Sequence, residues 1–260
     1  MYSTLLVSEP KPGIKLLTLN RPAVLNAIST EMITELKAFY LSLSTDQNIR
    51  VVIITGAGNK SFCSGADLKI RNQMTNAELE AQHRSLEELN FIALESLTPV
   101  IAAVNGYAFG GGAEIALLAD IIFASPDAVF ALPEAKVGLI PGFGGTQRMA
   151  RRIGIARTKE LIFSSSRIDA ETAMKWGLVN RIFSKESLID ESINVALSIK
   201  KNSPISIRES KQAIDKGYDL PLKDALNIEI DCYHRAMSSQ DRIEGINAFN
   251  EKREPNFKGK

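Results

Sequence analysis

The chain has 260 residues, of which 45% are hydrophobic and 23% are charged, and its formal net charge is +1 at pH 7. This length can bury a substantial core in one elaborated domain or in two. The nearly neutral charge excludes a general attraction to nucleic acid or to anionic membranes, and no apolar run approaches the roughly 20 residues that a membrane helix needs.

The first hundred residues alternate between short strands and helices. Ile14–Asn20 and Val51–Thr55 are rich in β-branched residues and are predicted strands. Between them, Ser29 is a suitable N-cap for a helix whose apolar residues follow a spacing of three and four. A second helix is expected over residues 75–96, and Pro99 introduces a buried strand at Val100–Val104.

The alternation then continues before the pattern changes. A helix opened by glycines is expected at Gly112–Ala119, with short strands at Ile121–Ala124 and Ala128–Ala131. Strand-then-helix units in series favour an α/β architecture over a sandwich. From about Arg148 the chain is nearly all helical, with helices expected over residues 155–163, 169–176, 186–200, 204–216, 222–237 and 240–251.

Two glutamates stand in glycine-rich apolar segments, where a carboxylate is costly to bury. Glu114 follows Gly110-Gly-Gly112, and Glu134 precedes a second glycine-rich segment. Two acids in such surroundings suggest a catalytic pair, because addition of water to a double bond needs one group to take a proton and another to supply one. Taken alone, Glu134 could equally form a salt bridge with Lys136 or with an arginine of residues 148–152.

Two loops could supply backbone N–H groups to an oxyanion. Gly111 precedes a predicted helix, where free N–H groups favour negative charge. Ala66 lies in the second loop, Ser64–Lys69, in which Asp67 could also act as a simple N-cap. The alternative for Gly111 is a tight turn packed against a neighbouring element.

Other chemistries find little support in the residue pattern. No complete dinucleotide fingerprint or nucleophile elbow is present, His83 and His234 are isolated in sequence, and no spacing suggests a metal site. Both histidines are expected at the surface or in packing. The arginines at 148, 151 and 152 suit a phosphate-bearing ligand or a solvated basic face about equally.

Several segments, which follow one another in the same order as in the enoyl-CoA hydratase/isomerase (crotonase) superfamily, resemble that superfamily along nearly the whole chain. These segments are Leu19-Asn-Arg-Pro22, Leu25-Asn-Ala27, Phe62-Cys-Ser-Gly-Ala-Asp-Leu68, Pro99–Gly112, Ile140–Arg148, Trp176-Gly-Leu-Val179, Asp241–Gly245 and Phe249–Arg253. The resemblance implies a crotonase-like spiral of ββα turns followed by a helical C-terminal region that builds trimers or dimers of trimers. Residues 1–200 would form the spiral core and residues 201–260 the oligomerisation region.

The resemblance also implies a CoA thioester substrate and places the site residues. The oxyanion donors fall on the N–H groups of Ala66 and Gly111, and the two carboxylates of the hydratase branch fall on Glu114 and Glu134. The positions implied for CoA binding are Leu25, Ala27, Ala66, Asp67, Leu68 and Lys69, with Phe249 and Lys252 reaching the adenine site of a neighbouring subunit.

Because both hydratase carboxylates are present, the expected reaction is reversible syn hydration of a short-chain 2-trans-enoyl-CoA, as in fatty acid β-oxidation. Several stretches look most similar to methylglutaconyl-CoA hydratases, so hydration of that branched acid is an alternative. An isomerase or another acyl-CoA reaction is a further alternative. CoA is part of the substrate, and no separate cofactor or metal is expected. Phe109 and Phe143 stand where smaller residues are common, so they either shorten the acyl pocket or pack in the core.

The expected location follows from cysteine usage and the amino end. Two cysteines far apart in sequence, Cys63 and Cys232, do not indicate a disulfide framework. The first residues show no secretory or mitochondrial pattern, so the cytoplasm is expected, or the mitochondrial matrix if a targeting segment has been removed. Binding to a membrane or to RNA is not expected.

Overall fold

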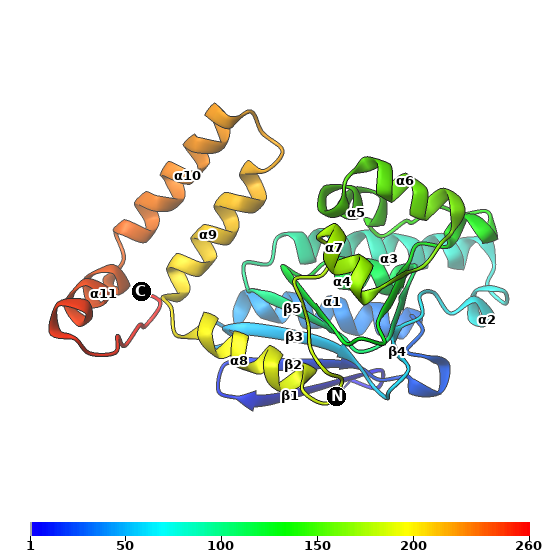
Figure 1. The fold of residues 1–260 in the computed structure, drawn as a ribbon, viewed down its shortest axis with the longest axis horizontal. Coiled ribbons are helices and arrows are strands. Elements are labelled where there is room, and N and C mark those ends of the chain that lie inside the picture. The colour runs from blue at the N-terminus through cyan, green and yellow to red at the C-terminus, as the bar shows by residue number, and fades with distance from the viewer. Residues whose placement is uncertain (1) are drawn as a thin grey trace.

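The computed structural model describes residues 2–260, which form two sheets surrounded by helices (Figure 1). The larger sheet has the strand order β1 (Leu5–Lys11), β2 (Ile14–Leu19), β3 (Val51–Gly56), β5 (Val100–Val104), β7 (Ile121–Ala124) and β10 (Arg181–Ile182). β1 and β2 are antiparallel, and all other neighbours in this sheet are parallel. The smaller sheet has the order β4 (Ser61–Cys63), β6 (Tyr107–Phe109), β8 (Val129–Ala131) and β9 (Ile168–Asp169).

The chain passes repeatedly from the larger sheet to the smaller one and then into a helix. β3 is followed by β4 and α3, β5 by β6 and α4, and β7 by β8 and α5. The helices of the body are α1 (Thr30–Thr45), α2 (Leu68–Arg71), α3 (Asn76–Leu94), α4 (Gly111–Leu117), α5 (Gly145–Ile153), α6 (Ile155–Ser164), α7 (Ala170–Trp176) and α8 (Leu188–Lys200), with short 3-10 turns η1 (Pro22–Val24) and η2 (Glu134–Val137). The repetition of ββα turns confirms the α/β spiral predicted from the sequence.

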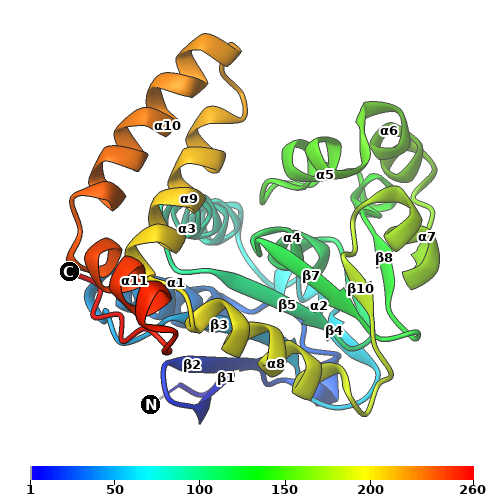
Figure 2. The same cartoon turned by 60° about the vertical axis from the view of Figure 1, so that its left-hand side comes forward.

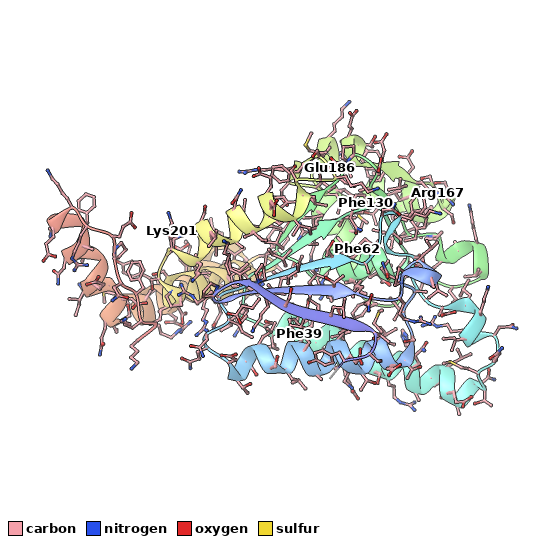
Figure 3. All side chains as sticks on the ribbon, turned by 90° about the horizontal axis from the view of Figure 1, so that it is seen from below. Phe39, Phe62, Phe130, Arg167, Glu186 and Lys201 are labelled. Atoms are coloured by element: carbon pink, nitrogen blue, oxygen red, sulfur yellow. The ribbon has the colours of Figure 1, made fainter. Side chains whose placement is uncertain are left out.

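The larger sheet is buried on both faces. Successive side chains of a strand point to opposite faces, so in β3 Val52 and Ile54 join the core that contains α1 and α3, whereas Val51 and Ile53 pack on the side of α8. This burial explains why β3 and β5 read as continuous apolar runs rather than as alternating ones. Phe39 of α1 lies on one side of the sheet, and Phe62 and Phe130 lie deep between the layers (Figure 3).

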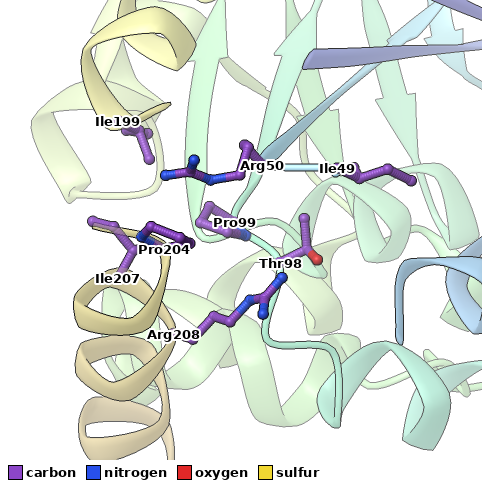
Figure 4. Close-up of a pocket in the computed structure, with 8 residues that line it drawn as sticks. All are labelled: Ile49, Arg50, Thr98, Pro99, Ile199, Pro204, Ile207 and Arg208. Atoms are coloured by element: carbon purple, nitrogen blue, oxygen red, sulfur yellow. The ribbon is translucent and has the colours of Figure 1, made fainter. Parts of the chain in front are cut away.

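The last three helices extend away from this body. α9 (Pro204–Gly217) and α10 (Leu222–Met237) pack against each other and project from the body, and α11 (Gln240–Glu251) lies beside their base (Figures 1 and 2). At the junction, the Arg50 guanidinium donates to the carbonyl oxygens of Lys200 (3.1 Å) and Asn202 (2.6 Å), where α8 ends. Arg50 also lines a small cavity of about 10 Å³ between the body and α9 (Figure 4).

Most predicted elements are present within one or two residues of their expected bounds, and Ser29 caps α1 by accepting from Met32 N–H. The elements not predicted are β1, β4, β6, β9, β10, α5 and the two 3-10 turns, and only the N-cap Asp67 indicated α2. Within the described residues, no helix has the length and apolar character needed to cross a membrane.

Candidate active site

The N–H group of Ala66 is left free by the way its loop is held. Ile28 and Ala66 form an isolated parallel bridge, in which Ile28 N–H donates to the Gly65 carbonyl (2.8 Å) and Asp67 N–H donates to the Ile28 carbonyl (3.1 Å). The flanking residues therefore make the hydrogen bonds. Ala66 N–H has no acceptor within residues 2–260.

Gly111 supplies a second free N–H group beside the first. It is the first residue of α4, and the opening N–H groups of a helix have no partner within the helix. A Cβ atom placed on Gly111 would lie 4.0 Å from the Ala66 nitrogen and 2.8 Å from Cδ1 of Ile28. The backbones of Ala66 and Gly111 thus approach each other closely, which allows two N–H groups to bind one oxygen atom.

Glu114 lies in the first turn of α4 and is only 3% exposed. Its Oε1 accepts hydrogen bonds from the backbone N–H groups of Phe143 (2.7 Å) and Gly145 (2.8 Å). Burial raises the pKa of Glu114 above its usual range, and the two hydrogen bonds and the charge of Arg148 oppose this shift. The hydrogen bonds favour the carboxylate form.

Glu134 opens η2 next to the glycine run before α4. Its Oε1 would lie 2.9 Å from a Cβ atom placed on Gly110, and its Oε2 is buried without a hydrogen-bond partner in the described chain. The pKa of Glu134 is raised to about 7, mainly by burial; a hydrogen bond from its own backbone N–H opposes this shift, and the negative charge of Glu114 contributes to it. Because Glu134 lies against Gly110, the N-cap of α4, and Glu114 lies in the first turn of the same helix, the two acids flank one site. Glu134 forms no ion pair within residues 2–260, so the salt-bridge interpretation is wrong.

The segments predicted to bind CoA are held together beside this site. Arg21 donates through Nη1 to the Ala27 carbonyl (2.6 Å) and to Oδ2 of Asp67 (3.1 Å). Asn26 is fully buried and donates to the carbonyls of Ala57 and Ser61, both at 2.9 Å. The loop at Leu25–Ala27 therefore lies against residues 66–69, whose last two members, Leu68 and Lys69, are exposed.

The N-cap interpretation of Asp67 is also confirmed, since its Oδ1 accepts from Ile70 N–H (3.3 Å). The two roles of this loop coexist, because the cap uses the Asp67 side chain and leaves Ala66 N–H free.

Phe249 and Lys252 are not brought to this site within the chain. Both belong to the α11 region, which Figure 1 shows at the end of the molecule opposite α2. Phe249 is 83% exposed. Their implied role in a neighbouring subunit stays a prediction.

The sequence did not place two residues beside Glu114: His83 was expected at the surface or in packing, and Arg148 in a cluster that suits a phosphate-bearing ligand or a solvated face. His83 of α3 faces the 142–145 segment, since a Cβ atom on Gly142 would lie 2.8 Å from its Cε1. Arg148 donates through Nη1 to Oδ1 of Asn90 (2.5 Å) and influences Glu114 electrostatically. Sequence spacing gives no signal for these contacts, because α3 and α5 are joined only through tertiary packing.

The arginine cluster and the two phenylalanines contact protein groups. Arg151 pairs with Asp219 (3.1 Å), and Arg152 donates to the carbonyl of Asp120 (3.3 Å). Phe143 is 2% exposed and belongs to the core. Phe109 stacks on Tyr107 with ring centroids 5.1 Å apart. Core packing therefore accounts for Phe143.

Comparison with known proteins adds to this geometry. The enoyl-CoA hydratase/isomerase family profile matches residues 9–260. The Bacillus subtilis protein YngF is 40% identical over 260 residues, covering 100% of both chains. The short-chain-enoyl-CoA hydratase of Clostridium acetobutylicum is 38% identical and covers 95% of each chain. The crystal structure of an enoyl-CoA hydratase from Bacillus anthracis superposes with a TM-score of 0.97 at 38% identity, covering 99% of this chain and 100% of that one.

Proposed function

The chain belongs to the enoyl-CoA hydratase/isomerase family, and from that membership and the site we propose that it is a hydro-lyase that adds water reversibly to a short-chain 2-trans-enoyl-CoA. The product is the 3-hydroxyacyl-CoA. The observation that carries this proposal is a pair of acids, the buried Glu114 and the half-buried Glu134, next to two free backbone N–H groups.

The oxyanion donors bind the thioester oxygen. In the mechanism we propose, this oxygen lies between the N–H groups of Ala66 and Gly111, and the dipole of α4 adds to their field. Polarisation of the thioester carbonyl makes C3 electrophilic and stabilises the negative charge that develops when water attacks there.

The two acids divide the proton transfers. Glu114, whose carboxylate form is favoured by two backbone hydrogen bonds that oppose the effect of burial, takes a proton from water as the oxygen bonds to C3. Glu134, whose pKa of about 7 keeps much of it protonated at neutrality, delivers its proton to C2. The two glutamates together hold one proton before and after hydration: it starts on Glu134, and after the reaction one proton is on Glu114. The reverse reaction, loss of water, starts from this second protonation state.

We place the CoA moiety against the loops of Leu25–Ala27 and Ala66–Lys69. Arg21 and Asn26 hold these loops together, and the exposed Lys69 suits the phosphates of the nucleotide. The reaction needs no cofactor besides the CoA that the substrate carries.

The C-terminal helices supply the proposed oligomer interface. Leu222, Tyr233, Ile214 and Tyr218 of the α9/α10 region are 64–75% exposed, and large apolar side chains exposed together on neighbouring helices are typical of an interaction surface. We propose that residues 201–260 assemble the chain into a trimer or a dimer of trimers, which brings Phe249 and Lys252 to a neighbour's CoA. Leu222→Arg should shift the protein to lower mass in sedimentation; an unchanged mass would exclude this surface as the interface.

The proposed reaction is tested by following loss of the enoyl-thioester absorbance of crotonyl-CoA and identifying the product. Formation of 3-hydroxybutyryl-CoA supports a hydratase. Release of free CoA, or conversion of a 3-enoyl-CoA without hydration, would assign a different reaction to this site. We propose the cytoplasm as its compartment, which fractionation of cells would check.

A further inference from the structure

Arg148 lies against the turn that positions Glu114. Residues 141–145 form this turn, which donates two backbone N–H groups to Oε1 of Glu114. The fit is close, since a Cβ atom on Gly145 would lie 2.9 Å from that oxygen. Gly144, between the two donors, has a φ of 94°, and a Cβ atom on it would overlap Nη1 of Arg148. The guanidinium therefore lies directly against the residue that separates the two donors.

A hydrogen bond ties this guanidinium to a second helix. Nη1 of Arg148 donates to Oδ1 of Asn90 (2.5 Å), and Asn90 belongs to α3. That Oδ1 would lie 3.3 Å from a Cβ atom on Gly144, so the amide and the guanidinium cover the turn together. Arg148 itself stands near the start of α5, where its backbone N–H donates to the Gly144 carbonyl (2.8 Å). Both the backbone and the side chain of Arg148 thus contact Gly144.

No acid pairs with this half-buried cation. Within residues 2–260, Arg148 makes no salt bridge, and its side chain makes no hydrogen bond besides the one to Asn90. Charged groups are seldom buried without a nearby opposite charge. Burial lowers the pKa of Arg148, and the negative charge of Glu114 opposes this shift. The charge of Arg148 in turn opposes the rise in pKa that burial imposes on Glu114. The contacts and the charges therefore both relate Arg148 to Glu114.

We propose that Arg148 is a positioning residue of the hydration reaction, anchored by Asn90, which holds the Gly144 turn so that both N–H donors stay on Glu114. This inference rests on the proposed hydratase function and adds a residue to its machinery. Without the guanidinium, the turn would relax more easily, because glycines allow many backbone conformations. Glu114 would then lose hydrogen bonds and a nearby cation, which together favour its carboxylate form.

Other charged or titratable groups also act on these two residues. Those that interact with Glu114 are His83 of α3, Arg71 of α2 and Glu134 of η2. Those that interact with Arg148 are Tyr40 of α1 and Arg151 and Arg152 of α5. His83 also contacts the turn, since a Cβ atom on Gly142 would lie 2.8 Å from its Cε1. A test by pH therefore needs a variant that lacks His83.

The test measures kcat and KM for crotonyl-CoA hydration as a function of pH. Arg148→Met removes the charge and the hydrogen bond but keeps an apolar stem. It should lower kcat on the order of 10- to 100-fold, a loss typical of a misplaced catalytic group, with KM changed by less than about threefold. Because Glu114 must be ionised to act as the base, loss of the cation should also move the fall of kcat at low pH to a higher pH.

Two milder variants separate the anchor from the charge. Asn90→Ala keeps the cation but removes its hydrogen-bond acceptor, so the loss of kcat and the shift of the pH profile should both be smaller than for Arg148→Met. Arg148→Lys keeps the charge without the planar guanidinium, and its kcat should lie between those of Arg148→Met and wild type. These variants test the proposal even if Arg148→Met does not fold.

Two controls exclude general effects. Arg151→Met, on the same helix, makes the same change in net charge at an arginine paired with Asp219, and it should leave kcat and the pH profile unaltered. In a His83→Gln background, Arg148→Met should still shift the profile to higher pH, because the shift belongs to Glu114 and not to the histidine.

The possible failures are distinguishable. A raised KM with unchanged kcat would show that Arg148 binds a phosphate of CoA. A lowered kcat with no shift of the pH profile would show that Arg148 only supports the fold. Either result would overturn the proposal while leaving the hydratase function intact. A wild-type protein that does not hydrate crotonyl-CoA would instead refute the proposed function, and this inference with it.

Discussion

Gly111→Ala tests the oxyanion site through its geometry. The added Cβ atom would lie 2.8 Å from Cδ1 of Ile28, closer than such atoms approach in proteins. Ile28 holds the Ala66 loop through two backbone hydrogen bonds, so a displaced Ile28 would misplace the second N–H donor as well. Losing one such donor costs on the order of 10²–10³ in kcat. The substitution displaces the donors without removing either N–H group, so we expect the loss for crotonyl-CoA to reach at most about that size.

The control for this substitution is Gly245→Ala, another helical glycine. An alanine Cβ atom at this position would contact only the Phe257 ring, at an ordinary distance of 3.4 Å. Because no neighbouring atom has to move, kcat should stay within about twofold of wild type. Ile28→Val removes the Cδ1 atom that the new Cβ would contact. In the crotonyl-CoA hydration assay, the double variant Ile28→Val/Gly111→Ala should therefore have a kcat about tenfold higher than Gly111→Ala alone. A folded Gly111→Ala variant with wild-type turnover would refute the oxyanion assignment, and failure of the double variant to recover would refute the route through Ile28.

Two further predictions concern proton transfer and loop stability. Burial raises the pKa of Glu134 to about 7, so this acid keeps its proton below pH 7 and loses it above. The value of kcat/KM for hydration should therefore fall roughly tenfold per pH unit on the alkaline side. A pH profile that stays flat to pH 9 would argue against Glu134 as the acid. Asn26→Ala should lower the free energy of unfolding by about 2–4 kcal/mol in urea titrations, because the buried carbonyl of Ser61 and the half-buried carbonyl of Ala57 lose their donor. Asn26 has a φ of 57°, so Asn26→Gly keeps the backbone free of strain and isolates the hydrogen-bond loss, and a variant as stable as wild type would contradict this role.

The predictable parts of the fold are those with strong local patterns. β3 and β5 are continuous β-branched or apolar runs, and α1 and α3 have capping residues that satisfy their first N–H groups. β4 and β6 are three residues long and exist only through pairing between turns of the spiral, so no local pattern reveals them. α5 begins with Gly145 after a left-handed Gly144, and those glycines read as loop rather than helix.

The same distinction applies to the site. Glu114 and Glu134 stand out in sequence because carboxylates are unusual in glycine-rich apolar segments. Arg71 and His83 do not stand out, since their relation to Glu114 depends on how α2 and α3 pack beside α4. Gly111 is suggested by the glycine run before a predicted helix, whereas Ala66 carries no residue-type signal, and its role as a donor is implied mainly by the resemblance to the family.

The role of the two acids is the central claim, and replacing each by its isosteric amide tests it most directly. Glu134→Gln and Glu114→Gln should each lower kcat for crotonyl-CoA on the order of 10²–10⁴, the range typical of general acid–base groups, with a much smaller change in KM. Glu186→Gln, at an exposed acid on the surface (Figure 3), serves as the matched control and should behave as wild type. Retention of more than a tenth of wild-type kcat by a folded Glu134→Gln variant would contradict the account.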